Sequence, residues 1–270
     1  SLHEQTQLLP RDSMPNAGGH ITWKQSNKRF TQGTLDENGT SPPNLGQALN
    51  YTFRKYGFMG SLRKAHFLGQ AFLETGALMF TSERGSDDYF RKMYEVYTPQ
   101  EAANDYDTRK AWLIKTGIVS TTRYPTRDAY IQQRPADIKK RAQQNGNTQP
   151  GDGARFRGRG LLQLTWHNGY RDYGTYRARD FTTDPSPLLL QSDAEVAADS
   201  ASYYWVKTHI DRCADKGATD QDVTACFHKV GGADGLSERK EFFHYTYFIL
   251  GDMPSMPMDR HLKRQTESTQ

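Results

Sequence analysis

The chain has 270 residues, a formal net charge of +4 and a hydrophobic fraction of 35%. It contains no apolar run near the roughly 20 residues that span a bilayer, and no repeated segment of the kind that builds solenoids or propellers. We therefore expect no membrane insertion. The basic residues are spread out without a nucleic-acid-binding motif, so we also expect no nucleic-acid partner.

The first part of the chain is polar and then becomes helical. Prolines and glycines interrupt residues 1–43, which predicts an irregular N-terminal arm. Asn44 is a favourable N-cap residue for a helix over residues 45–56. A second helix is expected from Ser61 onward, and it should end at Gly76 because glycine readily adopts the left-handed conformation that follows a helix.

The middle of the chain contains a strong signal for the start of a helix. Thr98-Pro99-Gln100-Glu101 combines a capping box with proline at the first helical position. It predicts a helix that runs to Lys115 and is closed by Gly117. Residues 145–153 hold nearly every residue type that favours turns, which indicates a loop, and the best strand candidate covers residues 156–165.

Three further helices are expected toward the C-terminus. Ser192-Asp193-Ala194-Glu195 forms a second capping-box pattern, which predicts a helix to Lys207. Thr219 is expected to cap a short helix that ends at Gly231-Gly232. The last helix should cover residues 237–250.

These elements predict a mainly α protein with a small β element and long loops. Its main domain is expected at residues 44–255, between the arm at 1–43 and a polar tail at 256–270. The two cysteines, Cys213 and Cys226, form either one disulfide or a pair of buried thiols. The histidines are dispersed without metal-ligand spacing, so we expect no metal and no cofactor.

Three stretches of the chain carry side chains that are suited to chemistry. They are Leu73-Glu74-Thr75-Gly76, then Gly158-Arg159-Gly160-Leu161-Leu162-Gln163-Leu164-Thr165, then the segment from Val230 to Arg239 with its glycines. At these residues the sequence resembles glycoside hydrolase family 19, which contains chitinases and lysozymes. The resemblance covers residues 45–251 and implies a lysozyme-like α+β fold.

Glu74 is the predicted general acid. It lies at the C-terminal end of an apolar helix, where the negative end of the helix dipole and desolvation both raise the pKa of a carboxyl group. A glycosidase acid has to keep its proton near neutral pH, so that it can protonate the leaving oxygen. Taken without its flanking motifs, Glu74 would be interpreted as an exposed carboxylate near a helix end, and the motifs reverse that interpretation.

Glu83 is the predicted second carboxylate, which activates a water molecule. The resemblance implies a second Glu shortly after the first, and Glu83 follows Glu74 by nine residues. In an inverting glycosidase the two carboxyl groups stand roughly 6.5–9.5 Å apart, which leaves room for the water. A surface ion pair with Arg84 is the alternative for Glu83, and Glu95 and Asp87 are then the candidate bases.

Four further residues are expected to contact the substrate or the acidic pair. The resemblance implies hydrogen bonds from Gln163 and Thr165 to the sugar or the attacking water, and a role for Arg239 in joining the two acids. Thr165 is also a suitable N-cap for a helix after Trp166. Tyr170 either stacks on a sugar ring or packs in the interior.

Three positions depart from the family pattern. Leu73 stands where the family has His before the acid, Val230 replaces the Asn of its later motif, and Gly169 replaces an Asn before Tyr170. These changes remove polar groups near the expected site. A wall-binding module with an inactive site is therefore kept as an alternative.

The resemblance implies hydrolysis of a β-linked amino-sugar polymer. The nine-residue spacing of the two acids is similar to that of phage-type and bacterial antibacterial lysozymes, and a pI of 8.9 suits an anionic cell wall. We therefore expect a lysozyme that cleaves the β-1,4 bond between MurNAc and GlcNAc. Chitinase activity and lytic transglycosylase chemistry are the enzymatic alternatives.

Such a lysozyme acts on peptidoglycan strands in the cell wall or the periplasm of a target cell. Similar domains occur as phage endolysins and as type VI secretion effectors, often behind another domain. The chain starts without a signal-peptide pattern, which favours delivery by another route or as part of a longer protein. We expect a monomer, with an immunity protein as a partner.

Overall fold

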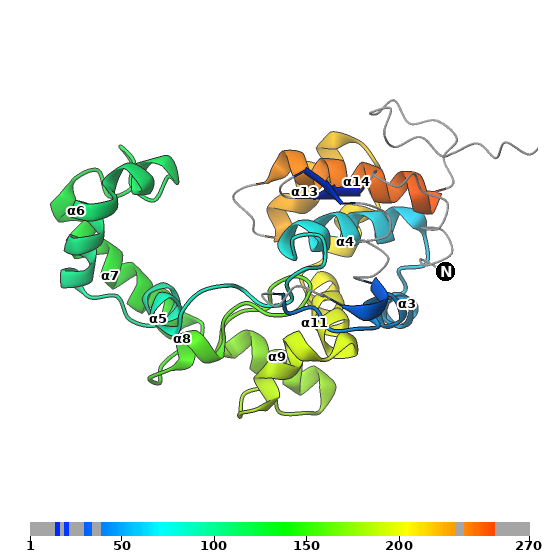
Figure 1. The fold of residues 1–270 in the computed structure, drawn as a ribbon, viewed down its shortest axis with the longest axis horizontal. Helices are drawn as coiled ribbons and strands as arrows, with labels where there is room; N and C mark the ends of the chain where they lie inside the picture. Colours follow the sequence, from blue (N-terminus) through cyan, green and yellow to red (C-terminus); the bar gives the residue numbers. More distant parts are fainter. Residues whose placement is uncertain (1–13, 17–18, 22–29, 34–38, 231–234, 252–270) are drawn as a thin grey trace, which may run out of the picture. The chain divides into compact units, whose positions relative to one another are not determined.

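The computed structural model describes residues 14–16, 19–21, 30–33, 39–230 and 235–251. Within these ranges the chain is mainly α-helical, which confirms the predicted fold class. The chain divides into two compact units (Figure 1). Unit 1 comprises Ser1–Glu83, Gly158–Leu164 and Leu188–Gln270, and unit 2 comprises Arg84–Arg157 and Thr165–Pro187.

Unit 1 contains the elements from both ends of the chain. They are β1 (Met14–Asn16), β2 (Gly19–Ile21), α3 (Leu45–Lys55), α4 (Ser61–Glu74), α10 (Leu189–Ser192), α11 (Ala194–Lys207), α12 (Ile210–Ala214), α13 (Asp220–Val230) and α14 (Leu236–Gly251). The two strands pair in antiparallel register, with Met14 opposite Ile21. Helix α4 packs along α14, and α11 packs against α3 (Figure 1).

A glycine lets α4 and α14 approach closely. A Cβ atom at Gly69 of α4 would lie 3.0 Å from the backbone of Phe243 in α14. Around this contact the interior of unit 1 is rich in aromatic rings, such as Phe67 against Trp205 at 5.4 Å and Phe72 against Phe242 at 5.7 Å between ring centroids. Burial of these rings contributes to the hydrophobic stabilisation of the unit.

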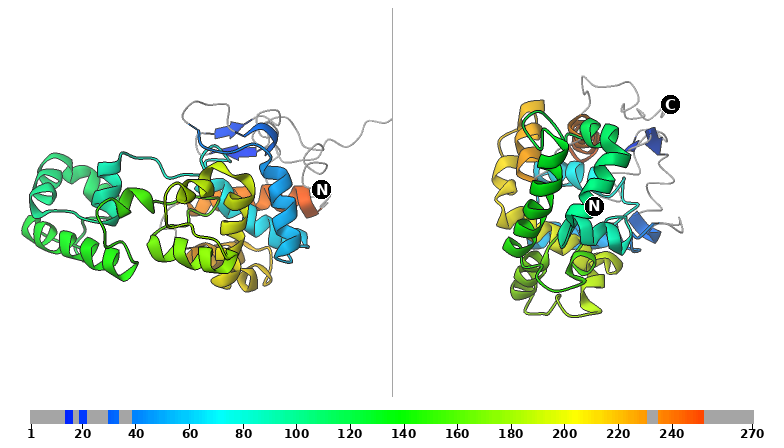
Figure 2. Two further views of the ribbon diagram at one scale, coloured as in Figure 1. Left: turned by 90° about the horizontal axis from the view of Figure 1, so that it is seen from below. Right: turned by 90° about the vertical axis from the view of Figure 1, so that its left-hand side faces the viewer.

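Unit 2 is built from the middle of the chain. Its helices are α5 (Asp87–Tyr94), α6 (Pro99–Lys115), α7 (Arg127–Gln144), α8 (Asp152–Arg155) and α9 (His167–Arg177), and a 3₁₀ helix, Ser186–Leu188, follows at its boundary. Helix α6 packs against α7 (Figure 2). A cluster of buried tyrosines fills the space between them: Tyr97, Tyr106, Tyr124 and Tyr130.

Two predicted helix caps are confirmed. Thr98 Oγ1 accepts a hydrogen bond from the amide of Glu101 at 3.2 Å, and the Glu101 carboxylate accepts one from the amide of Thr98 at 2.8 Å. Thr219 Oγ1 accepts from the amide of Asp222 at 3.2 Å. Each contact satisfies a backbone donor that has no partner within the helix.

Two other cap predictions differ from the structure. Asn44 stands at the predicted N-cap position of α3, but it has a φ of 63° and its side chain makes no cap hydrogen bond. The pattern at 192–195 does not form a capping box with Ser192, because the N-cap is Asp193, whose side chain accepts from the amide of Val196 at 3.0 Å. Ser192 instead ends α10 and donates to the carbonyl of Leu188 at 3.0 Å.

The sequence patterns missed the longer helices α5 and α7 and the short helices α8, α10 and α12, and they suggested one strand that does not form. Helices α5 and α7 begin after Ser86 and Thr126, whose side chains cap them. The expected strand at 156–165 is replaced by isolated bridges, in which Arg159 pairs with Ser82 and with Leu164. No described helix is long and apolar enough to cross a membrane.

Some predictions fall on residues outside the described ranges. These are the helix end at Gly231-Gly232, most of the arm at 1–43 and the tail at 256–270. The domain boundaries at 44 and 255 stay a prediction.

The two cysteines are buried thiols in the interior of unit 1. Burial raises the pKa of the Cys226 thiol, and a hydrogen bond with Cys213 acts in the same direction. Of the two alternatives left open by the sequence, the structure has the pair of thiols rather than the disulfide.

Candidate active site

Glu74 is the last residue of α4 and is partly exposed. The residues before it point into the core, where Ala71 and Phe72 are buried. The helix ends as predicted, since Gly76 has a φ of 56°. Glu74 is thus an accessible carboxylate at the end of a buried helix.

A buried arginine reaches Glu74 from a distant part of the sequence. Arg239 lies on α14, its side chain is 3% exposed, and its guanidinium forms an ion pair with the Glu74 carboxylate. The same guanidinium donates a hydrogen bond to Gln70 Oε1 at 2.5 Å. Because Gln70 lies four residues before Glu74 on α4, the two acceptors stand on the same face of the helix.

Gln70 is a member of this cluster that the sequence reasoning did not single out. It is fully buried, in a helix whose neighbouring residues are mostly apolar. The available signal was a polar residue one turn before the expected acid. Gln70 Nε2 and Arg239 Nε are buried donors with no hydrogen-bond partner among the described residues. Buried donors of this kind normally meet water or a ligand.

The charges around Glu74 act in opposite directions. The guanidinium of Arg239 places a positive charge beside the carboxylate, whereas the C-terminal end of the α4 dipole is negative. Burial raises the pKa of Tyr204, and the negative charge of Glu74 raises it further.

Glu83 is held by the backbone of the motif that starts at Gly158. Its amide donates to the Gly158 carbonyl at 2.8 Å, and its carboxylate accepts from the Gly158 amide at 3.3 Å. The side chain remains partly exposed. The carboxylate of Glu83 is thus held by a neutral backbone donor.

The Gly158–Leu164 segment fastens the residues that precede Glu83. The Gly160 amide donates to the Thr81 carbonyl at 2.8 Å. Gly160 has a φ of 79°, and a Cβ atom there would lie 2.7 Å from Ser200 Oγ, so only glycine fits. Arg159 is buried and donates to Gln191 Oε1 at 2.9 Å. The motif therefore positions Glu83 through backbone contacts.

Gln163 lies in the turn of the same segment. It has a φ of 52°, is partly exposed, and its side-chain amide donates to the Gly160 carbonyl at 3.4 Å. Gln163 belongs to unit 1, as do Glu74, Glu83 and Arg239.

The two remaining predicted site residues belong to unit 2, and for each of them the structure decides against one of the two roles that the sequence left open. Tyr170 is fully buried, and its hydroxyl donates to the Arg157 carbonyl at 2.7 Å. A ring without exposed surface cannot stack on a sugar, so Tyr170 packs in the interior. Thr165 is partly exposed but does not cap α9, because the N-cap position is Trp166 with a φ of 74°.

The alternative bases are engaged elsewhere in unit 2. Glu95 accepts hydrogen bonds from the amides of Gly151 and Gly153 at 3.1 and 3.0 Å. Asp87 is a highly exposed residue at the start of α5, 3.5 Å from Arg157. Among the described residues, no group of three or more His, Cys, Asp or Glu side chains is arranged to hold a metal ion.

Comparison with known proteins agrees with the motifs. The chain is 24% identical over 203 residues to a glycosyl hydrolase family 19 domain-containing protein of Haemophilus influenzae, which covers 73% of this chain and 84% of the relative. No protein-family model matches. A crystal structure of a chitinase C mutant aligns over 93% of this chain and 92% of its own, with a TM-score of 0.44 and 16% identity. The resemblance to family 19 is thus found both in the motifs and over most of the chain.

Proposed function

We propose that the protein is a family 19 glycoside hydrolase, and more narrowly a lysozyme that cleaves the β-1,4 bond between MurNAc and GlcNAc in peptidoglycan. The observation that carries the proposal is the contact of buried Arg239 with both Gln70 and Glu74 at the end of α4. A buried guanidinium that holds a partly exposed carboxylate is a costly arrangement, and it is typical of sites where a carboxyl group has to be oriented.

The proposed reaction is a single displacement with inversion. Glu74 donates its proton to the glycosidic oxygen as the bond from that oxygen to the anomeric carbon breaks. Glu83 takes a proton from a water molecule, whose oxygen forms the new bond to the same carbon on the opposite face of the ring. Glu83 leaves this step protonated and Glu74 ionised, and proton exchange with solvent restores both.

Arg239 and Gln70 are assigned to orientation rather than to proton transfer. Arg239 neutralises Glu74 after the acid has lost its proton, which stabilises the product state of the acid. Gln70 fixes the guanidinium from its other side. The unpaired donors of both side chains are buried, so they would serve to hold an internal water molecule.

Peptidoglycan is favoured as the substrate by two features of the chain. Only nine residues separate the two acids, a compact arrangement that resembles bacterial and phage lysozymes. The net charge of +4 also suits an anionic wall polymer. Chitin is the second candidate substrate, because it offers the same β-1,4 linkage between N-acetylated sugars.

Digestion of purified peptidoglycan by the wild type, Glu74→Gln and Glu83→Gln, followed by mass spectrometry, tests this proposal. Reducing MurNAc ends from the wild type, and almost none from either variant, support the two-carboxylate lysozyme. Anhydro ends would identify a transglycosylase, and products from chitin oligomers alone would identify a chitinase. Full activity of the Glu74→Gln variant would contradict the assignment of Glu74 as the general acid.

We extend the proposal to the place of action, which is the periplasm or cell wall of a target cell. Peptidoglycan is present there and absent from the cytoplasm. Expression of the chain in a Gram-negative host, with and without an attached export signal, tests this point. Lysis is expected only for the exported wild type, and exported Glu74→Gln should leave the cells intact.

A further inference from the structure

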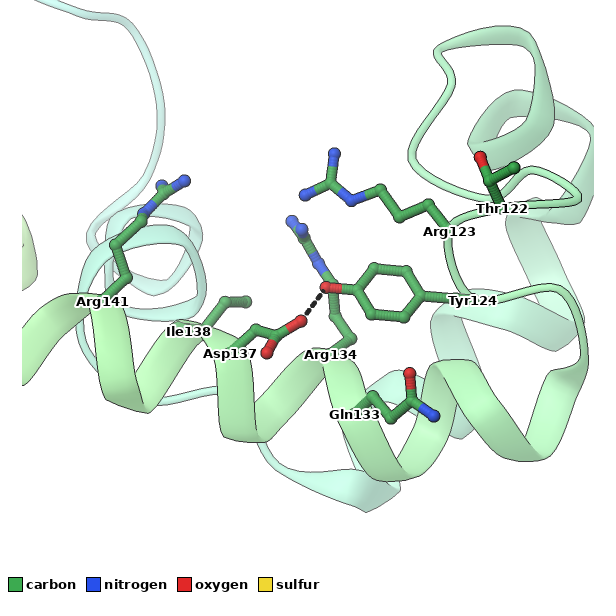
Figure 3. Close-up of a pocket in the computed structure, with 8 residues that line it drawn as sticks. All are labelled: Thr122, Arg123, Tyr124, Gln133, Arg134, Asp137, Ile138 and Arg141. Carbon is green, nitrogen blue, oxygen red and sulfur yellow. Dashed lines mark hydrogen bonds between the residues drawn. The ribbon is translucent and has the colours of Figure 1, made fainter.

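A pocket of about 420 Å³ lies within unit 2, between α7 and the loop that precedes it (Figure 3). Its walls carry three arginines, Arg123, Arg134 and Arg141, together with Tyr124 and Asp137. Figure 3 shows the guanidiniums of Arg123 and Arg134 directed into the same space above the Tyr124 ring, with that of Arg141 at its side. None of these residues has a part in the proposed hydrolysis.

The pocket has an excess of positive charge. Asp137 is the carboxylate that faces the arginines, and it already accepts a hydrogen bond from the Tyr124 hydroxyl at 2.5 Å. Three guanidiniums against one carboxylate give the wall of the pocket a net positive charge. Such an arrangement attracts anions.

Arg134 is the strongest sign that an anion belongs there. The residue is 9% exposed, and no acceptor among the described residues takes a hydrogen bond from its guanidinium. A guanidinium has five donors, and Figure 3 shows those of Arg134 directed into the pocket, where a ligand can accept hydrogen bonds from them. Burial also lowers the pKa of Arg141, and the positive charges of Arg134 and Arg123 contribute to the same decrease. An anion in the pocket would relieve this repulsion.

We propose that this pocket binds a carboxylate group of an acidic peptide, which, if the proposed function holds, is the stem peptide of peptidoglycan. The planar fork of a guanidinium matches the two oxygens of a carboxylate. Tyr124 and Ile138 provide apolar wall beside the charges, against which small peptide side chains fit. The volume holds more than a single oxyanion, which favours a carboxylate attached to a larger group.

Isothermal titration of the full chain with purified stem tetrapeptide tests the inference. The variants are Arg134→Gln and the more exposed Arg123→Gln. The matched control is Lys139→Gln, which removes one positive charge from an exposed position of the same helix outside the pocket. We expect each arginine variant to bind about tenfold more weakly, in line with the loss of one charge-assisted hydrogen bond, and the control to bind like the wild type.

A second titration uses the same peptide with its carboxylates amidated, and a third uses inorganic phosphate. The amidated peptide should not bind measurably. Equal binding of both peptide forms, or binding that is unchanged in both arginine variants, overturns the proposal. Tight binding of phosphate without binding of the peptide overturns it as well, because the site would then be one for phosphorylated ligands.

The proposed carboxylate site and the proposed hydrolase activity can be tested independently of each other. Hydrolysis is measured on glycan strands with and without their peptides, and Arg134→Gln should lower kcat/KM on the first substrate alone. If the wild type cleaves bare strands but does not bind the tetrapeptide, the proposed carboxylate site is wrong and the proposed hydrolase activity is kept. If the wild type binds the tetrapeptide but cleaves neither substrate, the proposed carboxylate site is supported and the proposed hydrolase activity is wrong. Circular dichroism spectra that match the wild type show that each variant is folded.

Discussion

Arg239 of α14 and Glu74 at the end of α4 form an ion pair, although 165 residues separate them in the chain. The guanidinium is almost fully buried while the carboxylate is partly exposed. Since the close packing of α4 on α14 brings the two side chains together, the geometry of Glu74 depends on the interior of unit 1. Changes at Arg239 and at the residues that hold Glu83 are therefore the most informative.

Removal of the guanidinium should impair the reaction more than it impairs folding. In Arg239→Ala, Gln70 and Glu74 lose their shared donor, and we expect kcat on peptidoglycan to fall about 100-fold. Arg239→Lys keeps the charge but cannot reach both acceptors in the same way, so it should recover only part of the rate. The measurement is steady-state release of reducing ends.

The matched control for this series is Arg212→Ala, an exposed arginine of α12. It should keep the rate of the wild type. Wild-type kcat in a folded Arg239→Ala variant would show that the ion pair is structural only.

Gly160 should tolerate no side chain. In Gly160→Ala the added methyl carbon would meet Ser200 Oγ at 2.7 Å in a backbone conformation that alanine rarely adopts. We expect a loss of about 1–3 kcal/mol in the free energy of unfolding beyond the backbone strain. Because the Gly160 amide holds Thr81, activity should fall as well. Urea denaturation monitored by circular dichroism gives the first quantity.

Gly57→Ala is the control that separates the cost of the left-handed backbone conformation from the cost of the steric contact with Ser200. Gly57 has a φ of 72°, but nothing lies within 4 Å of the position that an added methyl carbon would occupy. It should lose only the strain of the left-handed conformation, about 1 kcal/mol, with no loss of activity. Equal losses for the two variants would show that the contact with Ser200 is relieved by small movements.

His66 should make unit 1 sensitive to mild acid. Its ring is buried, and Nε2 donates to the Gly217 carbonyl at 2.8 Å while Nδ1 has no partner among the described residues. Burial lowers the pKa of His66 below its ordinary value of 6.5. The unfolded state therefore binds the proton more readily, so the free energy of unfolding should decrease as the pH falls below about 6.5.

Urea denaturation between pH 7.5 and pH 5 measures this dependence. His66→Gln should show a weaker decrease over that interval, whatever its stability at pH 7.5. The control is His228→Gln, because His228 is exposed. A slope that is the same in His66→Gln and the wild type would assign the pH dependence to other groups.

The buried thiols should be inert in the folded protein. Burial raises the pKa of Cys226, so little thiolate is present at pH 8, and the thiolate is the reactive form. We expect a thiol reagent such as dithionitrobenzoate to label neither cysteine in native buffer and both in urea. Rapid labelling of the native protein would contradict this placement.

The raised pKa of Cys226 also predicts that the free energy of unfolding depends on pH in the alkaline range. Since the folded state keeps the proton on Cys226 while the unfolded state releases it near pH 9, the free energy of unfolding should fall as the pH rises above about 9. Cys226→Ser would weaken this fall. Denaturation curves from pH 8 to pH 10 supply the comparison.

Local signals in the sequence were sufficient where a short contact decides the structure. The capping box at Thr98 and the cap at Thr219 were predicted correctly, because their partners lie within three residues. The signal was ambiguous at Ser192-Asp193, where two neighbouring residues can each serve as an N-cap and packing selected Asp193. The predicted helical class and the motifs of family 19 likewise needed no tertiary information.

Contacts between distant segments were decided by the tertiary structure alone. Nothing in the sequence around Gln70 indicates that Arg239 will reach it, since that contact needs α14 to pack on α4 through Gly69. The sequence leaves open whether Tyr170 stacks on a sugar or packs, and the interior of unit 2, which covers its ring, decides for packing. Periodicity and capping act over one or two helical turns, whereas burial and ion pairing depend on which elements meet across the fold.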